Sequence, residues 1–351
     1  MESRNRIGPL GGLAAIRRHP GNPIFSAADV PYPSTLAMNA GVTKYRGRYV
    51  MAFRNDVCRP DDFQRLVGTG TGMAFSEDGV HFTAAPEPMK FHYKGTVLER
   101  CNDTRLTVID DTLYLSFCFN GFHSERPGIA IYRDACNCEV ISLGVPAQRN
   151  LILAPDRING RYWRLERPYP RCRKTIGDIW ISYSQDLRYW GDAELLLAVE
   201  DVPFANLKIG GAAPPLKTER GFLMTFHAVD NDPDRVTRYP TVQREWTSRY
   251  TLGAALLDLN DPQQVIGITP TPLMVPQETY ETGDPAKFFR EDVIFPVGLV
   301  REDHGLLRIY YGAGDLWQCL AEIEEDTLLE AIQPCRRQAR FANLTKDQVG
   351  P

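Results

Sequence analysis

The sequence predicts an all-β fold, a five-bladed β-propeller that forms one domain. Three observations lead to this prediction. Short strand-like runs occur in pairs around a turn, the paired unit returns five times, and each unit continues into a further short strand. Long helical periodicity is missing except near residues 326–332. Three to four strands per unit, repeated five times, are typical of a propeller.

The five predicted hairpins follow one another along the chain. Each consists of an apolar run, a turn that contains glycine or aspartate, and a second apolar run. Tight turns favour these residues because they tolerate positive φ angles. The hairpins comprise residues 41–53, 106–117, 151–165, 213–226 and 293–311, and their turn anchors are Gly47, Asp111, Gly160, Gly221 and Gly305.

Each predicted hairpin leads into a third strand. After the first and third hairpins, residues 72–82 and 178–190 share an apolar strand, a serine, an acidic turn and an aromatic residue. The other three units continue with residues 128–132, 252–257 and 319–323. The strand pattern therefore predicts the same blade five times.

The propeller is predicted to span residues 21–335. Residues 1–20 and 336–351 are expected to form an N-terminal and a C-terminal tail. The longest irregular stretch, residues 229–246, is rich in Asp, Arg and Pro. A loop of this length in a compact domain is usually functional or disordered.

Composition and charge exclude several classes of protein. The 351 residues contain 40 Lys and Arg against 44 Asp and Glu, a formal net charge of −4, which argues against an electrostatic nucleic-acid binder. No apolar run approaches the ~18–20 residues that a membrane helix needs. No apolar segment follows residues 1–6, so the sequence predicts no secretory signal and a cytoplasmic location.

The eight cysteines do not have the spacing of a zinc site. Cys136 and Cys138 form the one close pair, and a single residue separates them. Without an export signal, we expect reduced thiols in core or strand positions. The eight are Cys58, Cys101, Cys118, Cys136, Cys138, Cys172, Cys319 and Cys335.

Polar residues follow the second strand of every predicted hairpin. In a propeller the inner strands point toward a central funnel, so these side chains are expected to converge there. Singly, each side chain could simply solvate a turn, but five in equivalent places favour a ligand site. They are Arg54, Asn120, Arg167, His227 and Asp315.

Asp103 stands directly before the predicted second blade. A carboxyl group beside apolar strands can have a raised pKa and serve as a general acid. Asp103 could equally cap a turn or pair with Arg105.

A third group of residues is basic. Arg149 precedes the third hairpin, Arg167 closes it, and Lys208 opens the fourth unit. Arginine presents a planar fork that matches phosphate oxygens, and lysine adds a point charge. Ordinary surface solvation or an ion pair such as Glu166 with Arg167 is the alternative. The glycines of residues 68–72 precede no helix, so we interpret them as a bulged strand and not as a nucleotide loop.

These segments resemble glycoside hydrolase family 130 over residues 20–330. The resemblance rests on eight motifs, which occur in the same order as in the family. They are Gly21-Asn-Pro-Ile24, Asn39-Ala40, Asn102-Asp-Thr-Arg105, Arg149-Asn150, Arg164-Leu-Glu-Arg-Pro168, Lys208-Ile-Gly-Gly-Ala-Ala-Pro-Pro215, Phe226-His-Ala228 and Tyr310-Tyr-Gly-Ala-Gly-Asp315. That family is a five-bladed propeller containing inverting β-mannoside phosphorylases and some β-mannosidases.

The resemblance implies roles for individual residues. Asp103 matches the family's general acid. The positions that hold inorganic phosphate in the phosphorylases are matched by Arg149, Asn150, Arg167, Lys208, His227 and Tyr250. Asn39, Arg54 and Asp315 match positions that line the mannose subsite. Two residues depart from the family pattern: Thr104 replaces a proline, and Asn102 stands where an aromatic or acidic residue is common.

The expected reaction is inverting phosphorolysis of a β-mannoside, with a β-1,4 linkage expected, to α-mannose 1-phosphate and a free sugar. An inverting hydrolase needs two carboxyl groups about 6.5–9.5 Å apart, whereas phosphorolysis needs one acid because phosphate is the nucleophile. Phosphate is thus a co-substrate, and no cofactor or metal is expected. A β-mannosidase and a non-catalytic sugar-binding propeller remain the alternatives. The expected partners are a β-mannoside and phosphate, with no nucleic acid or membrane, and a homo-oligomer is left open.

Overall fold

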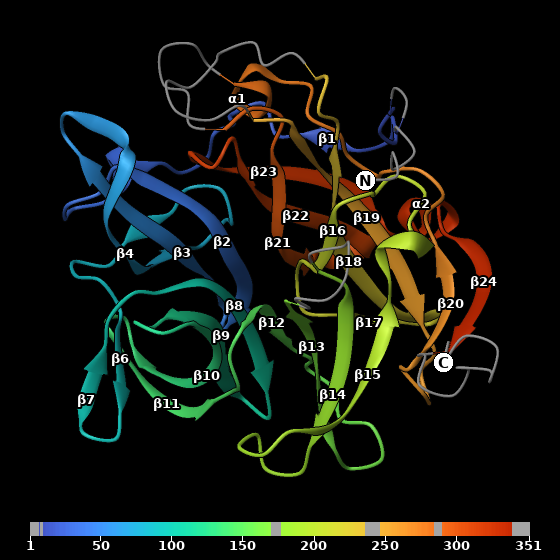
Figure 1. Ribbon diagram of the computed structural model, residues 1–351, viewed down its shortest axis with the longest axis horizontal. Coiled ribbons are helices and arrows are strands. Elements are labelled where there is room, and N and C mark those ends of the chain that lie inside the picture. Colours follow the sequence, from blue (N-terminus) through green and yellow to red (C-terminus); the bar gives the residue numbers. More distant parts are fainter. Residues whose placement is uncertain (1–6, 8–9, 170–176, 236–245, 284–289, 339–351) are drawn as a thin grey trace, which may run out of the picture.

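The computed structural model describes residues 7, 10–169, 177–235, 246–283 and 290–338. Within these residues the chain forms five mainly antiparallel sheets arranged around a central axis, the predicted five-bladed propeller (Figure 1). The helical periodicity near residues 326–332 corresponds to a short helix, α2 (Glu325–Glu330). Another short helix, α1 (Thr279–Thr282), precedes the fifth blade.

Each blade is one sheet, and its strands lie side by side in order from the axis outward. The first blade contains β2 (Leu36–Tyr45), β3 (Arg48–Arg59), β4 (Asp62–Ser76) and β5 (Thr83–Ala84). The second contains β8 (Cys101–Ile109), β9 (Thr112–Asn120), β10 (Glu125–Asp134) and β11 (Asn137–Leu143), extended by β6 (Lys90–Tyr93) and β7 (Thr96–Leu98). The third contains β12 (Gln148–Leu153), β13 (Tyr162–Pro168), β14 (Ile179–Ser184) and β15 (Gly191–Leu197).

The last two blades include strands from distant parts of the chain. The fourth contains β16 (Lys208–Gly211), β17 (Leu216–Thr218), β18 (Gly221–Asn231), β19 (Ser248–Leu257), β20 (Gln264–Ile268) and β24 (Gln333–Gln338). The fifth contains β21 (Ile294–Arg301), β22 (Leu306–Ala313), β23 (Trp317–Glu324) and β1 (Arg17–Arg18). The predicted N-terminal tail therefore contributes β1, and β24 runs from the predicted propeller into the predicted C-terminal tail.

Strand β1 closes the ring. Arg17 pairs with Glu322 and Arg18 with Ala321, so the start of the described chain becomes the outer strand of the last blade. The Arg18 side chain binds both carboxylate oxygens of the fully buried Glu281, at 2.7 and 2.9 Å. The Tyr311 hydroxyl donates to the same carboxylate at 2.8 Å. The closure is thus fixed by side chains as well as by strand pairing.

The fourth hairpin differs from the prediction. The inner strand is β16, and residues 213–215, expected to begin the hairpin, form no strand. Pro214 and Pro215 have no backbone N–H to donate, so pairing with β18 stops and resumes at β17. The predicted loop 229–246 also begins later, because β18 continues to Asn231. Residues 236–245 of that loop lie outside the described residues.

Apolar side chains fill the spaces between neighbouring blades. In one such cluster, Trp163 and Leu165 of β13 pack with Phe222 and Met224 of β18. The Trp163 and Phe222 rings meet edge to face, with centroids 5.3 Å apart. Seven of the predicted thiols are free, and five of these are buried; Cys172 lies outside the described residues. In the described part of the chain, no helix is long and apolar enough to cross a membrane.

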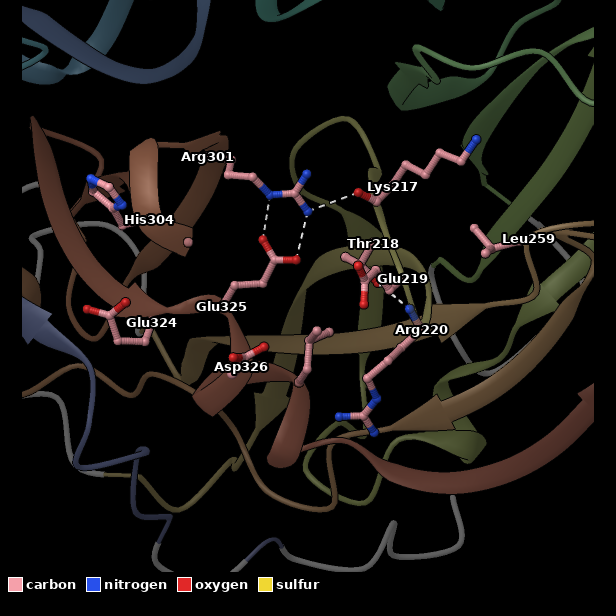
Figure 2. A pocket seen from close by; sticks show the side chains of 12 residues that line it. Lys217, Thr218, Glu219, Arg220, Leu259, Arg301, His304, Glu324, Glu325 and Asp326 are labelled. Carbon is pink, nitrogen blue, oxygen red and sulfur yellow. Dashed lines mark hydrogen bonds and ion pairs between the residues drawn. The ribbon is translucent and has the colours of Figure 1, made fainter.

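The face that carries the hairpin turns holds a cavity of about 680 Å³ between the fourth and fifth blades (Figure 2). Two of its charged side chains form an ion pair. Arg301 binds both carboxylate oxygens of Glu325, at 2.5 and 2.7 Å, and donates to the Lys217 carbonyl at 2.9 Å. The predicted site residues lie on the opposite face.

Candidate active site

Three inner strands share one local irregularity. Strands β2, β8 and β12 each contain a bulge in their pairing, at Asn39, Asp103 and Asn150 respectively. All three residues have positive φ angles, of 49°, 52° and 53°. Asn and Asp adopt this left-handed conformation more readily than other non-glycine residues, and a bulge redirects the side chain it carries. The repeat therefore presents three polar side chains at equivalent places on neighbouring blades.

The second strands contribute side chains beside these bulges. Arg54 lies opposite Met38, the residue before the first bulge, and Arg167 lies opposite Arg149, the residue before the third. The prediction that Arg54 and His227 follow the second strands of their hairpins is wrong, because β3 and β18 continue beyond them. What these side chains share is their register beside the inner strand.

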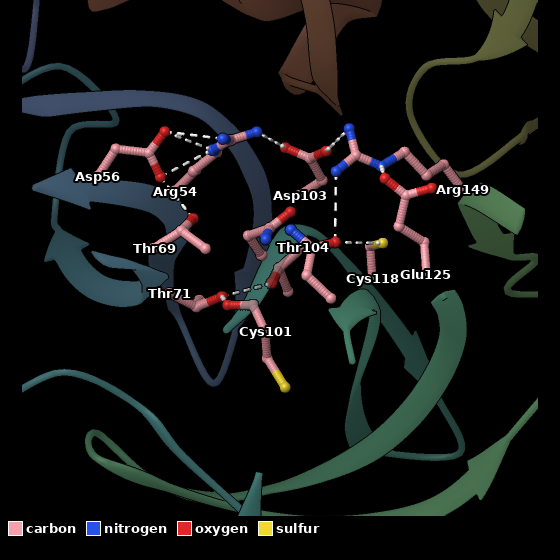
Figure 3. Close-up of polar contacts among 12 residues, drawn as sticks. Arg54, Asp56, Thr69, Thr71, Cys101, Asp103, Thr104, Cys118, Glu125 and Arg149 are labelled. Carbon is pink, nitrogen blue, oxygen red and sulfur yellow. Dashed lines mark hydrogen bonds and ion pairs between the residues drawn. The ribbon is translucent and has the colours of Figure 1, made fainter. Parts of the chain in front are cut away.

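Asp103 is the centre of an ion-pair network (Figure 3). Its carboxylate is 3.4 Å from Arg54 Nη1 on one side and 3.9 Å from Arg149 Nη1 on the other. Arg54 is itself held by Asp56, whose carboxylate lies 2.7 Å from Arg54 Nη2 and accepts a 2.5 Å hydrogen bond from Thr69. The acid candidate is thus fixed between two arginines from different blades.

The pKa of Asp103 is shifted in the direction opposite to the expected one. The residue is only 8% exposed, and burial by itself opposes ionisation. The guanidinium groups of Arg54, Arg149 and Arg105 outweigh that effect and hold the Asp103 pKa below its usual value. The expectation of a raised pKa is therefore wrong for the free site, because the prediction considered apolar strands and not cations from neighbouring blades.

Arg105 has a position that the sequence did not indicate. It is fully buried and does not pair with the Asp103 carboxylate; Nη1 donates to the Asp103 carbonyl at 2.5 Å. Nε donates to the carbonyl of Ala212, in the break between β16 and β17, at 3.2 Å. Its guanidinium also lies 5.6 Å from the centroid of the Phe295 ring. Arg105 therefore joins the bulge that carries Asp103 to the fourth blade.

A second group of side chains gathers the predicted basic residues. Arg167 Nη1 lies 3.4 Å from His227 Nε2, and Lys208 Nζ lies 5.1 Å from the centroid of the Tyr250 ring. The His227 and Tyr250 rings stack with centroids 6.1 Å apart. A Cβ at Gly210 would lie 2.5 Å from His227 Cε1, so only glycine allows the imidazole this close to β16.

Burial and neighbouring cations change the pKa values of this group. Burial, followed by the charge of Arg167, lowers the Lys208 pKa to about 7. Burial together with Arg167 and Lys208 holds the His227 pKa well below its usual value, so the imidazole is neutral. Asp315 has a raised pKa, chiefly from burial, which Arg290 and Arg54 oppose. The lowered pKa values of Lys208 and His227 reduce the positive charge on these side chains, and with it their repulsion from Arg167.

Several buried donors of the site have no hydrogen-bond partner in the described part of the chain. They are Arg105 Nη2, Arg167 Nε and His227 Nδ1. Buried polar groups are almost always paired, and an unpaired donor costs roughly 1–3 kcal/mol. Three such donors on neighbouring side chains, with Lys208 beside them, are chemically suited to hydrogen-bond an anion.

The remaining predicted residues lie on the same elements. Asn39 and Asn150 occupy the first and third bulges and are buried. The Asn39 Oδ1 atom has no partner in the described chain. Asp315 follows β22, has a φ of 54°, and is close enough to Arg54 and Asp103 for their charges to affect its pKa. Among the described residues, no group of three or more His, Cys, Asp or Glu side chains is arranged to hold a metal ion.

Fold and site together define a propeller enzyme in which a carboxylate between arginines lies beside a group of buried basic side chains. The family model described as β-1,4-mannooligosaccharide phosphorylase matches residues 17–334, and the chain belongs to glycoside hydrolase family 130.

Individual relatives agree with this assignment. The chain is 31% identical to a β-1,2-mannobiose phosphorylase of Listeria innocua over 264 residues, 74% of this chain and 68% of the relative. It is 27% identical to a β-1,4-mannooligosaccharide phosphorylase of Ruminococcus albus over 335 residues, 91% of each chain. The structure of the Listeria innocua β-1,2-mannobiose phosphorylase in complex with β-1,2-mannobiose is similar with a TM-score of 0.75 and 26% identity, covering 90% of this chain and 98% of that one.

Proposed function

We propose that this enzyme catalyses the inverting phosphorolysis of a β-mannoside. Inorganic phosphate would attack the anomeric carbon, the bond from that carbon to the glycosidic oxygen would break, and the products are α-mannose 1-phosphate and a free sugar. Family membership and relatives named as mannoside phosphorylases support the reaction type.

The single observation that carries the proposal is the set of unpaired buried donors beside Asp103. Arg167 Nε and His227 Nδ1 are buried, and their neighbours Lys208 and Arg149 add further positive charge. A water nucleophile needs a base and no such charge, whereas a phosphate dianion needs charge-assisted donors. We assign phosphate binding to Arg149, Asn150, Arg167, Lys208, His227 and Tyr250.

Asp103 is the proposed general acid. It would supply the proton that the leaving oxygen takes up, either directly or through a mannose hydroxyl, the route that the family resemblance implies. The free site holds Asp103 ionised, so the acid has to gain a proton before it reacts. A phosphate dianion bound at Arg149 offsets one of the cations that lower the Asp103 pKa. Phosphate binding thus favours the protonated acid.

The mannose unit is proposed to lie against Asn39, Arg54 and Asp315. Arg54 contacts the Asp103 carboxylate, so a sugar held there lies beside the acid. The relatives act on different linkages by their names, β-1,2 in one and β-1,4 in the other. The expected β-1,4 linkage therefore stays a prediction. The free thiols support the predicted cytoplasmic location, because reducing compartments keep cysteines unpaired.

The proposal is tested by product analysis. The enzyme is incubated with β-1,4-mannobiose and, separately, β-1,2-mannobiose, each with and without phosphate. We expect mannose 1-phosphate to form from one of them, only when phosphate is present, and as the α anomer by NMR. Release of free mannose alone, at the same rate with and without phosphate, would make the enzyme a hydrolase.

A further inference from the structure

Trp246, the last residue of the irregular stretch 229–246, packs beside the predicted phosphate residues. Its ring is nearly parallel to the Tyr250 ring, with an interplanar angle of 8° and centroids 6.0 Å apart. Tyr250 stacks in turn with His227 at 6.1 Å and 24°. The indole Nε1 of Trp246 donates to the Glu291 carbonyl at 2.7 Å, which fixes the ring. Trp246 thus supports Tyr250 from outside the set of residues assigned to phosphate.

Arg290 extends this stack. Its guanidinium carbon lies 4.8 Å from the centroid of the Trp246 ring. A cation over an aromatic face is attracted to it, and tryptophan is the strongest partner of this kind. Arg290 therefore holds the Trp246 ring in place on one side, while the Glu291 carbonyl holds its nitrogen.

The backbone of residues 290–293 contacts both halves of the site. The Arg290 N–H donates to the Gly314 carbonyl at 3.2 Å, and the Gly314 N–H donates to the Val293 carbonyl at 3.1 Å. Gly314 directly precedes Asp315. The Tyr250 N–H donates to the Asp292 carbonyl at 2.9 Å. Residues 290–293 are therefore hydrogen-bonded both to the strand that carries Tyr250 and to the turn that carries Asp315.

The charge of Arg290 also acts on Asp315. Burial raises the Asp315 pKa, and Arg290, followed by Arg54, is the cation that opposes this effect. Arg54 is shared with the carboxylates of Asp56 and Asp103, so it cannot replace Arg290 fully. The titratable and charged groups that act on Asp315 or respond to it are Arg290, Arg54, Lys208, Asp103, Asp56 and Tyr250.

We propose that Arg290 is a positioning residue that joins the two predicted subsites: through Trp246 it orients Tyr250 for phosphate, and through its charge and its contact with Gly314 it supports Asp315 for mannose. An ionised carboxylate accepts hydrogen bonds from sugar hydroxyls, which gives the charge of Arg290 a role in binding. The inference rests on the proposed function for the names of the two ligands.

The Asp315 half is tested by the pH dependence of kcat/KM for the mannoside. Arg290→Gln removes the cation, so the Asp315 pKa should rise and the acidic limb of the profile should move to higher pH. Arg290→Lys keeps a positive charge and should leave the limb near that of wild type. Trp246→Leu keeps Arg290 and should not move the limb. Comparing each variant with wild type removes the effect of phosphate's own ionisation.

The Tyr250 half is tested by calorimetric titration with inorganic phosphate. Trp246→Leu and Arg290→Gln should each weaken phosphate binding roughly threefold to tenfold, because both remove the stack beside Tyr250. Trp246→Phe, which keeps an aromatic ring, should bind phosphate more tightly than Trp246→Leu. The matched control is Arg48→Gln. Arg48 lies 4.2 Å from the centroid of the Phe75 ring, but at the turn between β2 and β3 on the opposite face, so neither measurement should change.

The two halves separate this inference from the proposed function. If the wild-type enzyme binds no phosphate and only hydrolyses the mannoside, the proposed function fails, and the pH profile of hydrolysis still decides the role of Arg290. The inference is overturned if Arg290→Gln has a wild-type unfolding midpoint and changes neither the acidic limb nor phosphate binding. Should Arg290→Gln fail to fold, unchanged phosphate binding by Trp246→Leu overturns it instead.

Discussion

Arg167 Nη1 lies 3.4 Å from His227 Nε2, and this contact fixes the state of the imidazole. An arginine nitrogen can only donate, so Nε2 has to accept and the ring proton is on Nδ1. The Nδ1 atom is buried and has no partner in the described chain, which makes it a donor available to a ligand. Arg167 thus prepares its neighbour for an anion as well as presenting its own donors.

Arg167→Ala should weaken phosphate use in particular. The change removes a charge-assisted contact worth roughly 1.5–3 kcal/mol, and it no longer holds the His227 ring proton on Nδ1. The kcat/KM for phosphate should therefore fall about tenfold to 150-fold. The KM for the mannoside should change much less. Arg167→Lys should rescue poorly because an ammonium lacks the fork. Arg301→Ala, on the opposite face, is the control; an equal loss there would contradict the assignment.

Asp103→Asn should lower kcat by about 10²–10⁴, the usual contribution of a general acid. The amide fits the bulge and keeps hydrogen bonds to Arg54, so the circular dichroism spectrum and unfolding midpoint should stay near wild type. The measurement is turnover of an unactivated mannoside. Near-normal turnover would move the acid to another residue.

Lys208 predicts a pH dependence for phosphate. With a pKa of about 7, the amine is charged below that pH and neutral above it. The ratio of wild-type to Lys208→Gln kcat/KM for phosphate should therefore be roughly tenfold or more at pH 6 and approach one as the pH rises above 7. Comparing the two enzymes removes the effect of phosphate's own ionisation. A ratio that stays constant with pH would show that Lys208 does not titrate in this range.

Arg105→Met should raise the pKa of Asp103, because it removes one of the three cations that lower it. It also frees the carbonyls of Asp103 and Ala212, so we expect a fall in kcat of about tenfold or more. Since a general acid works only while it is protonated, the alkaline limb of the pH profile should be displaced upward. The matched control is Arg126→Met. Arg126 likewise donates to two carbonyls, of Gly144 and Leu143, but contributes no charge to Asp103. If both variants lose stability and neither shifts the pH profile, Arg105 is only structural.

Glu281→Gln should destabilise the ring closure. It removes a fully buried carboxylate that binds Arg18 and Tyr311, and breaking a buried ion pair costs about 3–5 kcal/mol. Urea unfolding should show the loss. Arg17→Gln on the same strand breaks only an exposed contact to Glu324 of 4.0 Å and should cost ~1 kcal/mol or less. Equal stability of the two variants would show that the pair does not hold β1.

The five-fold repeat of hairpins could be predicted from the sequence because each hairpin depends on its own apolar runs and turn residues. Turn residues such as Gly47 and Asp111 have the positive φ angles that their types suggest, and they fixed the hairpins. The fourth inner strand was misplaced because residues 213–216 were predicted as a strand, while Pro214 and Pro215 interrupt the pairing.

The site was less predictable because its energetics arise between blades. The motif containing Asp103 was found, but its low pKa depends on Arg54 and Arg149, which come from two other blades. Arg105 was noted only as a neighbour of Asp103. Its contact with Ala212 spans 107 residues of sequence, and no local pattern indicates it.

The pairing of β1 with β23 also determines when the propeller can close during translation. Arg18 leaves the ribosome early, but its partners on β23 are made about 300 residues later. At the usual ~5–20 residues per second, the first strand has no partner for roughly 15 to 60 seconds. The ring, and with it the arrangement of Asp103 and Arg149 around one axis, can close only after translation has passed the fifth blade. Until then the nascent chain exposes an unpaired edge that chaperones are suited to cover.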